Sequence, residues 1–136
     1  MLATLPRFII LAIYMAKVHS LRRKSTLALR QRKTALVRFL IPPPQAIRAS
    51  VVERFGTCGK PSCRCHQGHK HGPYYYLTQC VSKGHVRKFL LRTVQDQQAA
   101  RHAVDSFNEF YDRLEELSQI NAELLRRGEP LSGSAP

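Results

Sequence analysis

Carboxylates are nearly missing from the first two thirds of the chain. Residues 1–45 contain no Asp or Glu, and residues 46–92 contain one, Glu53. Acid–base catalysis on paired carboxylates and two-metal catalysis both need several carboxylates close together. A phosphate-binding glycine loop and a nucleophile motif are missing as well. The sequence therefore predicts that the protein is not an enzyme.

Tryptophan and long apolar runs are also missing. The apolar run FIILAIYMA at 8–16 has nine residues, whereas a transmembrane helix needs about 20. A secretory signal peptide would need a cleavage site of small residues after this run, but Lys17, Val18 and His19 follow it. We therefore expect a cytoplasmic protein without a membrane span, in which Met15 is an alternative start to Met1.

Basic residues dominate the composition. The 136-residue chain has a formal net charge of +13. Residues 1–45 contain nine Lys or Arg, residues 46–92 contain nine, and residues 93–136 contain four against eight acids. A basic body is typical of proteins that bind a polyanion, although a merely solvated surface gives the same composition.

The pattern of residues predicts an α+β fold that begins with a basic helix. In the segment 1–45, apolar residues recur near a 3.6-residue period from about Met15 to Leu40. The triplet Pro42–Pro44 ends this helix, because proline lacks the amide donor. The first 14 residues are expected to add little to the fold.

The middle segment, 46–92, is expected to hold a loop and two to three antiparallel strands. A short strand or extended lead-in at 49–55 is followed by a loop rich in Gly, Cys and His at 56–72. Residues 74–81 and 86–92 are rich in β-formers and predict a hairpin with a four-residue turn.

The last segment predicts a long helix from Thr93 to Arg127, followed by a disordered tail at 128–136. Thr93 and Asp96 stand in capping-box positions, and Gly128 favours the end of the helix. Heptad positions form a seam that predicts either a two-stranded coiled coil, with one polar position fixing the register, or packing on the helix at 18–40. The seam residues are Ala100, Ala103, Phe107, Phe110, Leu114, Leu117, Asn121 and Leu124.

Cys58, Cys63 and Cys65 predict a structural zinc site. The residues between these thiols are Gly, Lys, Pro, Ser and Arg, so packing in a core does not explain them. Closely spaced Cys and His on a turn supply the tetrahedral donors that zinc needs. The zinc would fasten a loop in a segment with little apolar core.

His71 is the first candidate for the fourth ligand, with Cys80 and His69 as reserves. The alternative for Cys80 is a buried free thiol. Three other interpretations of the cysteines compete with zinc: disulfides, an iron–sulfur cluster and a catalytic thiol. Each is weaker, because a Cys-x-Cys pair is awkward to bridge, the spacing is irregular, and one nucleophile leaves two thiols unexplained.

The stretch IRASVVERFGTCGKPSCRCHQGHKHGPYYYLTQ resembles a family of small uncharacterised bacterial proteins, a domain of unknown function often found near mobile elements. The resemblance covers about residues 47–125, and the first 40 residues depart from it. The boxes CGKP-x-CRC and HGPYYYL place the family pattern on Cys58, Cys63, Cys65 and His71. The resemblance implies that Cys80 is not part of this pattern, and it implies no activity.

These features together predict a zinc protein that binds nucleic acid, with DNA as the first candidate. The zinc loop is expected to bring its basic residues near those of the hairpin, while Tyr75, or Tyr74 with Tyr76, offers a stacking surface. Packing against the long helix is the alternative for at least one face of the tyrosines. In the second hypothesis zinc is purely structural, and the last helix forms a homodimer or binds a larger protein. The candidate contacts to nucleic acid are Arg22, Arg23, Lys24, Lys60, Arg64, Lys70, Lys83, Arg87 and Lys88.

Overall fold

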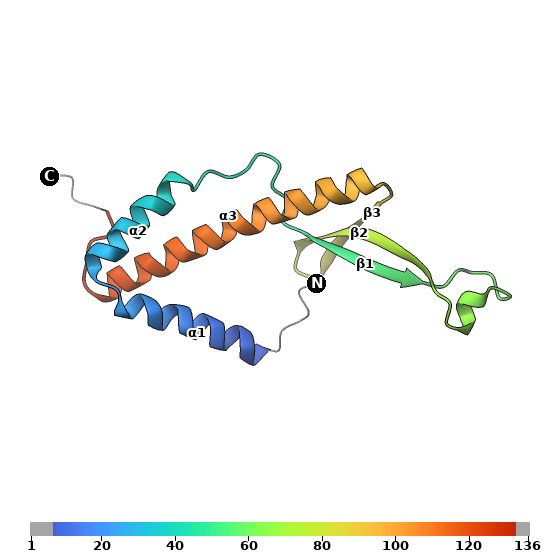
Figure 1. Cartoon of the computed structure of the whole chain (residues 1–136), viewed down its shortest axis with the longest axis horizontal. Coiled ribbons are helices and arrows are strands. Elements are labelled where there is room, and N and C mark those ends of the chain that lie inside the picture. The colour runs from blue at the N-terminus through green and yellow to red at the C-terminus, as the bar shows by residue number, and fades with distance from the viewer. Residues whose placement is uncertain (1–6, 133–136) are drawn as a thin grey trace. The chain divides into compact units, whose positions relative to one another are not determined.

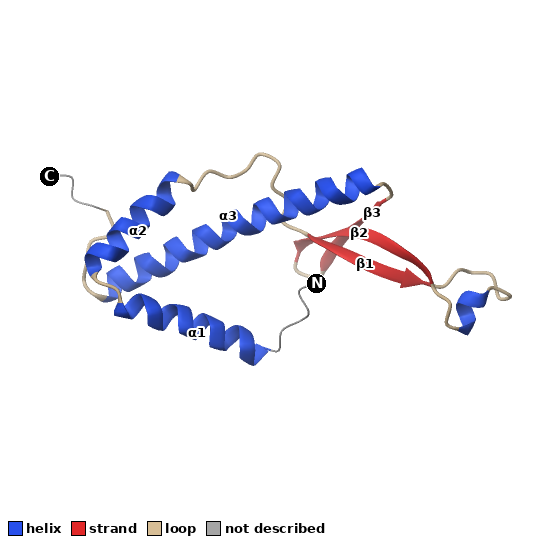
Figure 2. Cartoon of the chain, viewed as in Figure 1, coloured by secondary structure: helices blue, strands red, loops and turns tan. Residues whose placement is uncertain are grey.

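The structure is a computed structural model that describes residues 7–132. It confirms the α+β class, with a three-stranded antiparallel sheet and a long C-terminal helix (Figures 1 and 2). None of the described helices has the length and apolar character needed to cross a bilayer. The elements are α1 (Arg7–Arg23), α2 (Thr26–Arg38), β1 (Ser50–Gly56), the 3-10 helix η1 (Arg64–Gln67), β2 (His71–Ser82), β3 (His85–Leu91) and α3 (Val94–Arg126).

The chain divides into two compact units. The helical unit consists of Met1–Ile41 and Tyr111–Pro136, and the sheet unit consists of Pro42–Phe110. The long helix α3 therefore contributes its C-terminal part to the first unit and its N-terminal part to the second. Each unit is described separately below.

A small leucine-rich core holds the helical unit together. Leu29 of α2 and Ile120 and Leu124 of α3 are fully buried, and Leu117 packs against them. Leu21 of α1 and Leu36 of α2 complete this core. Figure 1 shows α1 and α2 along the C-terminal part of α3. Burial of such side chains contributes about 1.5–3 kcal/mol each.

Two helices replace the single helix predicted between Met15 and Leu40. The first begins at Arg7 and ends at Arg23, and the Ser25 side chain caps the second by accepting a hydrogen bond from the Ala28 amide at 3.2 Å. A serine cap competes with helix continuation because its oxygen binds an amide of the next turn. The residues at 1–6 and 133–136, which include part of the predicted tail, lie outside the described residues.

Arg127 joins the α1–α2 turn to the end of α3. Its guanidinium donates to the carbonyl oxygens of Leu21, Arg22 and Lys24 at 2.9–3.2 Å. These carbonyls lie at the end of α1, where backbone acceptors lack helical partners and a cation is stabilising. The same guanidinium donates to Glu123 at 2.8 Å. One side chain therefore links the end of α3 to the end of α1 and the turn that follows it.

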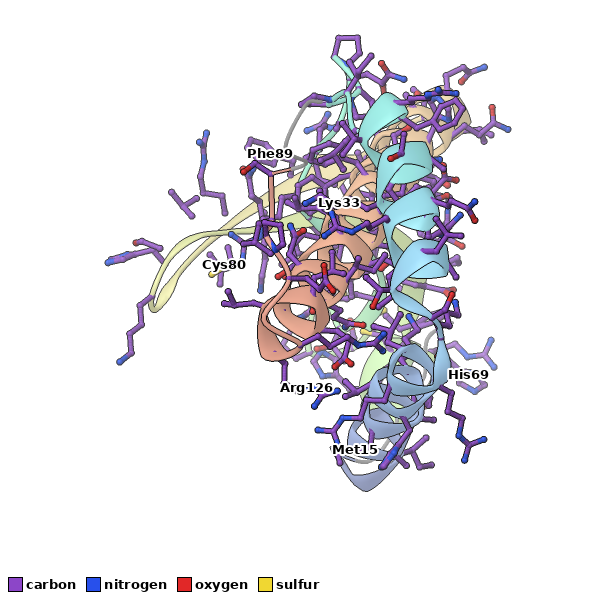
Figure 3. All side chains as sticks on the ribbon, turned by 90° about the vertical axis from the view of Figure 1, so that its left-hand side faces the viewer. Met15, Lys33, His69, Cys80, Phe89 and Arg126 are labelled. Atoms are coloured by element: carbon purple, nitrogen blue, oxygen red, sulfur yellow. The ribbon has the colours of Figure 1, made fainter. Side chains whose placement is uncertain are left out.

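Ion pairs connect the basic N-terminal helices to the acidic end of the chain. Arg32 donates two hydrogen bonds to Glu116 at 2.6 and 2.7 Å, and Arg30 donates to Glu129 at 2.7 Å. In Figure 3 the labelled Lys33 lies on α2, and its ammonium donates to the carbonyl oxygen of Leu131. These ion pairs therefore stabilise the packing of the basic α2 helix against the acidic C-terminal end of the chain.

Glu123 should make the helical unit sensitive to acid. Its carboxylate is 7% exposed, and hydrogen bonds from Arg126 and Arg127 lower its pKa from 4.5 to about 2. A pKa depressed by folding adds stability above the unfolded value, and that stability is lost as the pH falls towards the folded value. We expect the unfolding free energy to fall between about pH 4.5 and about pH 2.

The measurement is denaturant unfolding followed by far-UV circular dichroism across this pH range. The Glu123→Gln variant should lose this part of the acid dependence, while Asp112→Asn, an exposed change on the same helix, should keep it. Identical acid profiles for Glu123→Gln and the wild type would contradict the prediction.

The sheet unit is built on β2, which pairs with β1 on one edge and β3 on the other. The register places Arg54 opposite Tyr74, and Thr78 opposite Lys88. A two-residue turn at Lys83 and Gly84 joins β2 to β3, shorter than the four-residue turn predicted. Gly84 has a φ of 82°, which glycine adopts without strain.

The N-terminal part of α3 covers one face of this sheet. The predicted capping box is confirmed, because Thr93 and Asp96 exchange hydrogen bonds at 3.0 and 3.3 Å. The guanidinium of Arg101 lies over the Tyr75 ring, 5.5 Å from its centroid. The amide of Ile47 donates to the Ala103 carbonyl at 3.0 Å, which fastens the lead-in of β1 to the helix.

Candidate metal centre and basic sheet

The four predicted zinc ligands come together at the end of the β1–β2 pair. The donor atoms of Cys58, Cys63, Cys65 and His71 all lie within 4.8 Å of one another. Cys58 follows β1, Cys63 precedes η1, Cys65 lies in η1, and His71 is the first residue of β2. Figure 1 shows this loop projecting from the end of the two strands. The cluster could therefore hold one metal ion.

The spacing of the donors fits a tetrahedral ion. The Sγ atoms of Cys58 and Cys65 are 3.6 Å apart, and Cys63 Sγ is 3.3 Å from His71 Nε2. A zinc ion with bonds of about 2.3 Å to sulfur and about 2.0 Å to nitrogen holds its donors about 3.5–3.8 Å apart. Small side-chain rotations are enough to reach these separations.

Tight turns explain how three thiols converge within eight residues. The amide of Cys63 donates to the Lys60 carbonyl, and the amide of His66 donates to the Cys63 carbonyl, both at 3.1 Å. These turns bring the Cys65 side chain close to Cys58, whose amide donates a hydrogen bond to the Cys65 sulfur at 3.3 Å. An amide aimed at sulfur stabilises a thiolate, which is the form that binds metal.

The thiols differ in their tendency to ionise. A hydrogen bond from the backbone of Cys65 lowers the pKa of Cys63 below its ordinary value. Burial raises the pKa of the Cys65 thiol, which is 2% exposed. A bound divalent cation reverses such a burial effect, because a coordinating thiol loses its proton outright. A metal bound at this cluster would therefore remove the proton that burial favours on the Cys65 thiol.

Gly72 places His71 beside β1. Its φ is 132°, and a Cβ atom there would lie 2.9 Å from the Arg54 carbonyl and 3.0 Å from Phe55 Cδ1. Only glycine fits this contact without displacing the β1 backbone. The HGPYYYL box thus contains the residue that allows its histidine to reach the cysteines.

The reserve ligands are not part of this cluster. Cys80 is exposed, and its thiol donates to the Ser82 carbonyl at 3.4 Å, so the buried thiol considered from the sequence is wrong. In Figure 3 Cys80 lies on the β2–β3 hairpin, well apart from His69 of the metal loop. His69 is exposed and contributes no donor to the group. No disulfide joins any of the four cysteines.

The basic residues of the metal loop and of the hairpin turn lie apart. The loop residues Lys60, Arg64 and Lys70 precede β2, whereas Lys83 follows it. Since β2 has 12 residues, its two ends are on the order of 35 Å apart. The expectation that the zinc loop lies near the hairpin turn is therefore wrong, because the loop connects β1 to β2 rather than folding over the hairpin.

The other predicted contacts to nucleic acid do not share one surface. Lys88 pairs with Thr78 and shares a face with Tyr74 and Tyr76, whereas Arg87 lies on the opposite face, 5.2 Å from the Phe89 ring centroid. Arg22, Arg23 and Lys24 belong to the end of α1 and the turn after it, in the helical unit.

The structure adds two residues that the sequence had not singled out. Arg54 and Phe55, at the end of β1, line a recess of about 310 Å³ together with Gly56, Tyr74, Tyr76 and Lys88. No local motif marks Arg54 or Phe55. Only the register that places Arg54 opposite Tyr74 identifies them.

The seam predicted on α3 is divided between the units. Leu117 and Leu124 pack into the core formed with α1 and α2, so this part follows the intramolecular alternative. In the sheet unit Ala100 and Ala103 are buried, and Phe107 and Phe110 are half-buried. Leu114 is 40% exposed, and Asn121 has a buried Oδ1 without a partner among the described residues. A homodimer through α3 stays a prediction.

Comparison with known proteins identifies a family but no activity. No curated protein and no solved structure matches the chain. A family model described as a domain of unknown function, DUF6788, matches residues 22–100. The match begins at the end of α1 and includes α2, so the departure expected over the first 40 residues holds only before residue 22. A bacterial origin and a mobile-element setting stay predictions. Since the match covers more than half of the sequence, the chain belongs to the DUF6788 family.

Proposed function

We propose that this protein is a small zinc-binding protein that binds nucleic acid, with DNA as the first candidate, through the basic residues of its sheet unit. One observation carries the proposal: all nine Lys and Arg between residues 46 and 92 are exposed, and none takes part in an ion pair within residues 7–132. In the helical unit Arg30 and Arg32 are paired with carboxylates of the same chain, whereas Arg38 is exposed and has no ion-pair partner among the described residues.

Nine exposed cations without an ion-pair partner in the described part of the chain, all on the sheet unit, favour a polyanionic partner. Lys and Arg that replace condensed counterions on a phosphate backbone supply affinity without sequence preference. Glu53 is the one carboxylate between residues 46 and 92, so little repulsion opposes a phosphate chain there. Positive charge in such excess exceeds what solubility alone needs.

Zinc has a structural role in this proposal. Three thiols and one imidazole form a closed set of four ligands, which is typical of structural rather than catalytic zinc. The metal would hold the loop that carries Lys60, Arg64 and Lys70 at the end of β1 and β2. The same shortage of carboxylates that argues against catalysis leaves this centre without a general base.

The partner alternative depends on α3. Two residues of the seam, Leu117 and Leu124, already pack with α1 and α2, whereas Leu114 stays 40% exposed. This contact favours nucleic-acid binding over dimerisation as the first function to test.

Binding should weaken steeply as salt is added. Fluorescence anisotropy with duplex and single-stranded DNA and RNA probes, between about 50 and about 200 mM salt, measures this slope. Arg64→Ala and Lys88→Ala should each weaken binding several-fold and reduce the slope by about one contact.

Arg38→Ala is the matched control, because Arg38 is an exposed cation at the end of α2, outside the sheet unit. It should leave the affinity within about twofold if binding requires the sheet unit rather than overall charge. An affinity that ignores salt over this range, or equal losses in Arg38→Ala and Lys88→Ala, would count against the proposal.

A further inference from the structure

The three consecutive tyrosines of β2 divide between two different environments. Tyr75 faces α3, where Arg101 lies over its ring. Strand alternation sends Tyr74 and Tyr76 to the other face. Tyr74 is 43% exposed and Tyr76 is half-buried, so this second face keeps an aromatic surface open.

Cations surround these two rings. Arg54 on β1 stands opposite Tyr74. Lys88 on β3 stands opposite Thr78, which is two residues along β2 from Tyr76. Both cations line the recess of about 310 Å³ described above, and both are exposed. Phe55, which is 55% exposed, adds a further aromatic ring at its edge. Aromatic rings and unpaired cations thus alternate over one short stretch of sheet.

Negative charge is kept off this face. Glu53 stands opposite Tyr75, and therefore lies on the face that α3 covers. The recess is lined by aromatic, basic and glycine residues, without a carboxylate. A phosphate group approaching Arg54 or Lys88 would consequently meet no acidic side chain among the residues of the recess.

We propose, building on the nucleic-acid binding proposed above, that this recess binds a single-stranded segment, with bases stacked on Tyr74 and Phe55 and phosphates held by Arg54 and Lys88. Binding to single strands combines a basic groove with aromatic side chains on which bases stack, and it tolerates sequence because every base has a flat face. A duplex keeps its bases stacked on one another, so it offers phosphates to cations but no base faces to exposed rings.

The metal centre adjoins this recess. Gly56, which lines the recess, is paired with His71, and a Cβ atom at Gly72 would lie 3.0 Å from the Phe55 ring. Fixing His71 to the cysteines therefore fixes the end of β1 that carries Arg54 and Phe55. We therefore expect the metal to order the stacking surface, and the metal-bound protein is the form to test.

The test compares a labelled oligothymidine and an oligouridine of about 12 nucleotides with a duplex at one salt concentration. Tyr74→Ala and Phe55→Ala should weaken single-strand binding about 5-fold to 100-fold, while duplex binding changes by less than about twofold. Tyr74→Phe should bind as the wild type does, because it keeps the ring.

Phe39→Ala is the matched control for Phe55→Ala, because Phe39 is a 67% exposed phenylalanine that caps α2 in the helical unit. It should leave both affinities unchanged. Metal content and circular dichroism verify that each variant is folded, and Phe55→Ala with Tyr74→Phe test the recess even if Tyr74→Ala fails to fold.

Several outcomes would overturn this inference. One is a wild-type protein that binds single strands no more tightly than duplex, and another is a folded Tyr74→Ala or Phe55→Ala variant with unchanged single-strand affinity. If duplex binding remains and depends on Arg64 and Lys88, only the single-strand inference fails. If neither probe binds at low salt, the proposed function fails as well.

Discussion

Replacing Cys65 with serine should abolish stoichiometric zinc binding and unfold the loop between β1 and β2. Cys65 is 2% exposed, and its sulfur lies 3.6 Å from Cys58 Sγ and accepts the Cys58 amide. A serine hydroxyl is a poor replacement for a thiolate, because zinc prefers soft sulfur donors in closed structural sites. We expect zinc to fall from about one ion per chain to near zero.

The loss should extend from the metal to the fold. Structural zinc contributes folding free energy directly, since the unfolded chain has no preformed site. In the sheet unit Cys65 is one of only four buried residues among those described, together with Ala100, Ala103 and Val104. Amide hydrogen exchange over 57–72 should therefore become much faster in Cys65→Ser, and faster in the wild type after chelation.

Cys80→Ser provides the matched control, because Cys80 is exposed and outside the cluster. It should retain about one zinc per chain and the slow exchange of the loop. Metal analysis of the purified proteins measures the first effect. Full zinc content in Cys65→Ser, or its loss in Cys80→Ser, would show that the centre has been assigned to the wrong thiols.

Truncating Leu124 to alanine should remove most of the stability of the helical unit. Leu124 is fully buried among leucines of α1 and α2, and truncation leaves a cavity that the surrounding helices fill only in part. Buried Leu→Ala changes cost about 2–5 kcal/mol, which is a large fraction of the stability of a small unit. The loss should affect α1 and α2 together, because one core holds both.

Its neighbour Leu125 supplies an internal comparison. Leu125 is 64% exposed on the same helical turn, so Leu125→Ala has the same effect on helix propensity without opening a cavity. Urea unfolding followed by circular dichroism should separate the two variants by about 2 kcal/mol or more. Similar midpoints for both variants would mean that α1 and α2 do not pack on this part of α3.

Local motifs predicted the cluster of metal-binding side chains well, because these residues are close in sequence. Cys58, Cys63 and Cys65 lie within eight residues, and two short turns are enough to bring their sulfurs together. His71 was the first candidate for the fourth donor, and the geometry supports it over Cys80 and His69. The capping box at Thr93 and Asp96 was predictable for the same reason.

Longer-range features were predicted less well. The break at Ser25 has only a weak signal in the sequence, since a serine inside a helical pattern fits either a cap or a continuing helix. Nothing in the sequence distinguishes Arg127 from the other basic residues, but its guanidinium donates hydrogen bonds to the carbonyl oxygens at the end of α1 and just after it. Such contacts join residues about a hundred positions apart, so the pattern of residues within one segment cannot predict them.

The sequence by itself determined that carboxylates are scarce in the first 92 residues, that three closely spaced thiols form most of one donor set, and that the tyrosines of β2 alternate between two faces. Only the tertiary structure decided which of these faces is open, that Arg54 and Phe55 join Tyr74 there, and that the basic metal loop and Lys83 lie at opposite ends of β2. The reason is physical: composition and spacing act along one strand or turn, whereas strand register and helix docking set which side chains meet across the sheet.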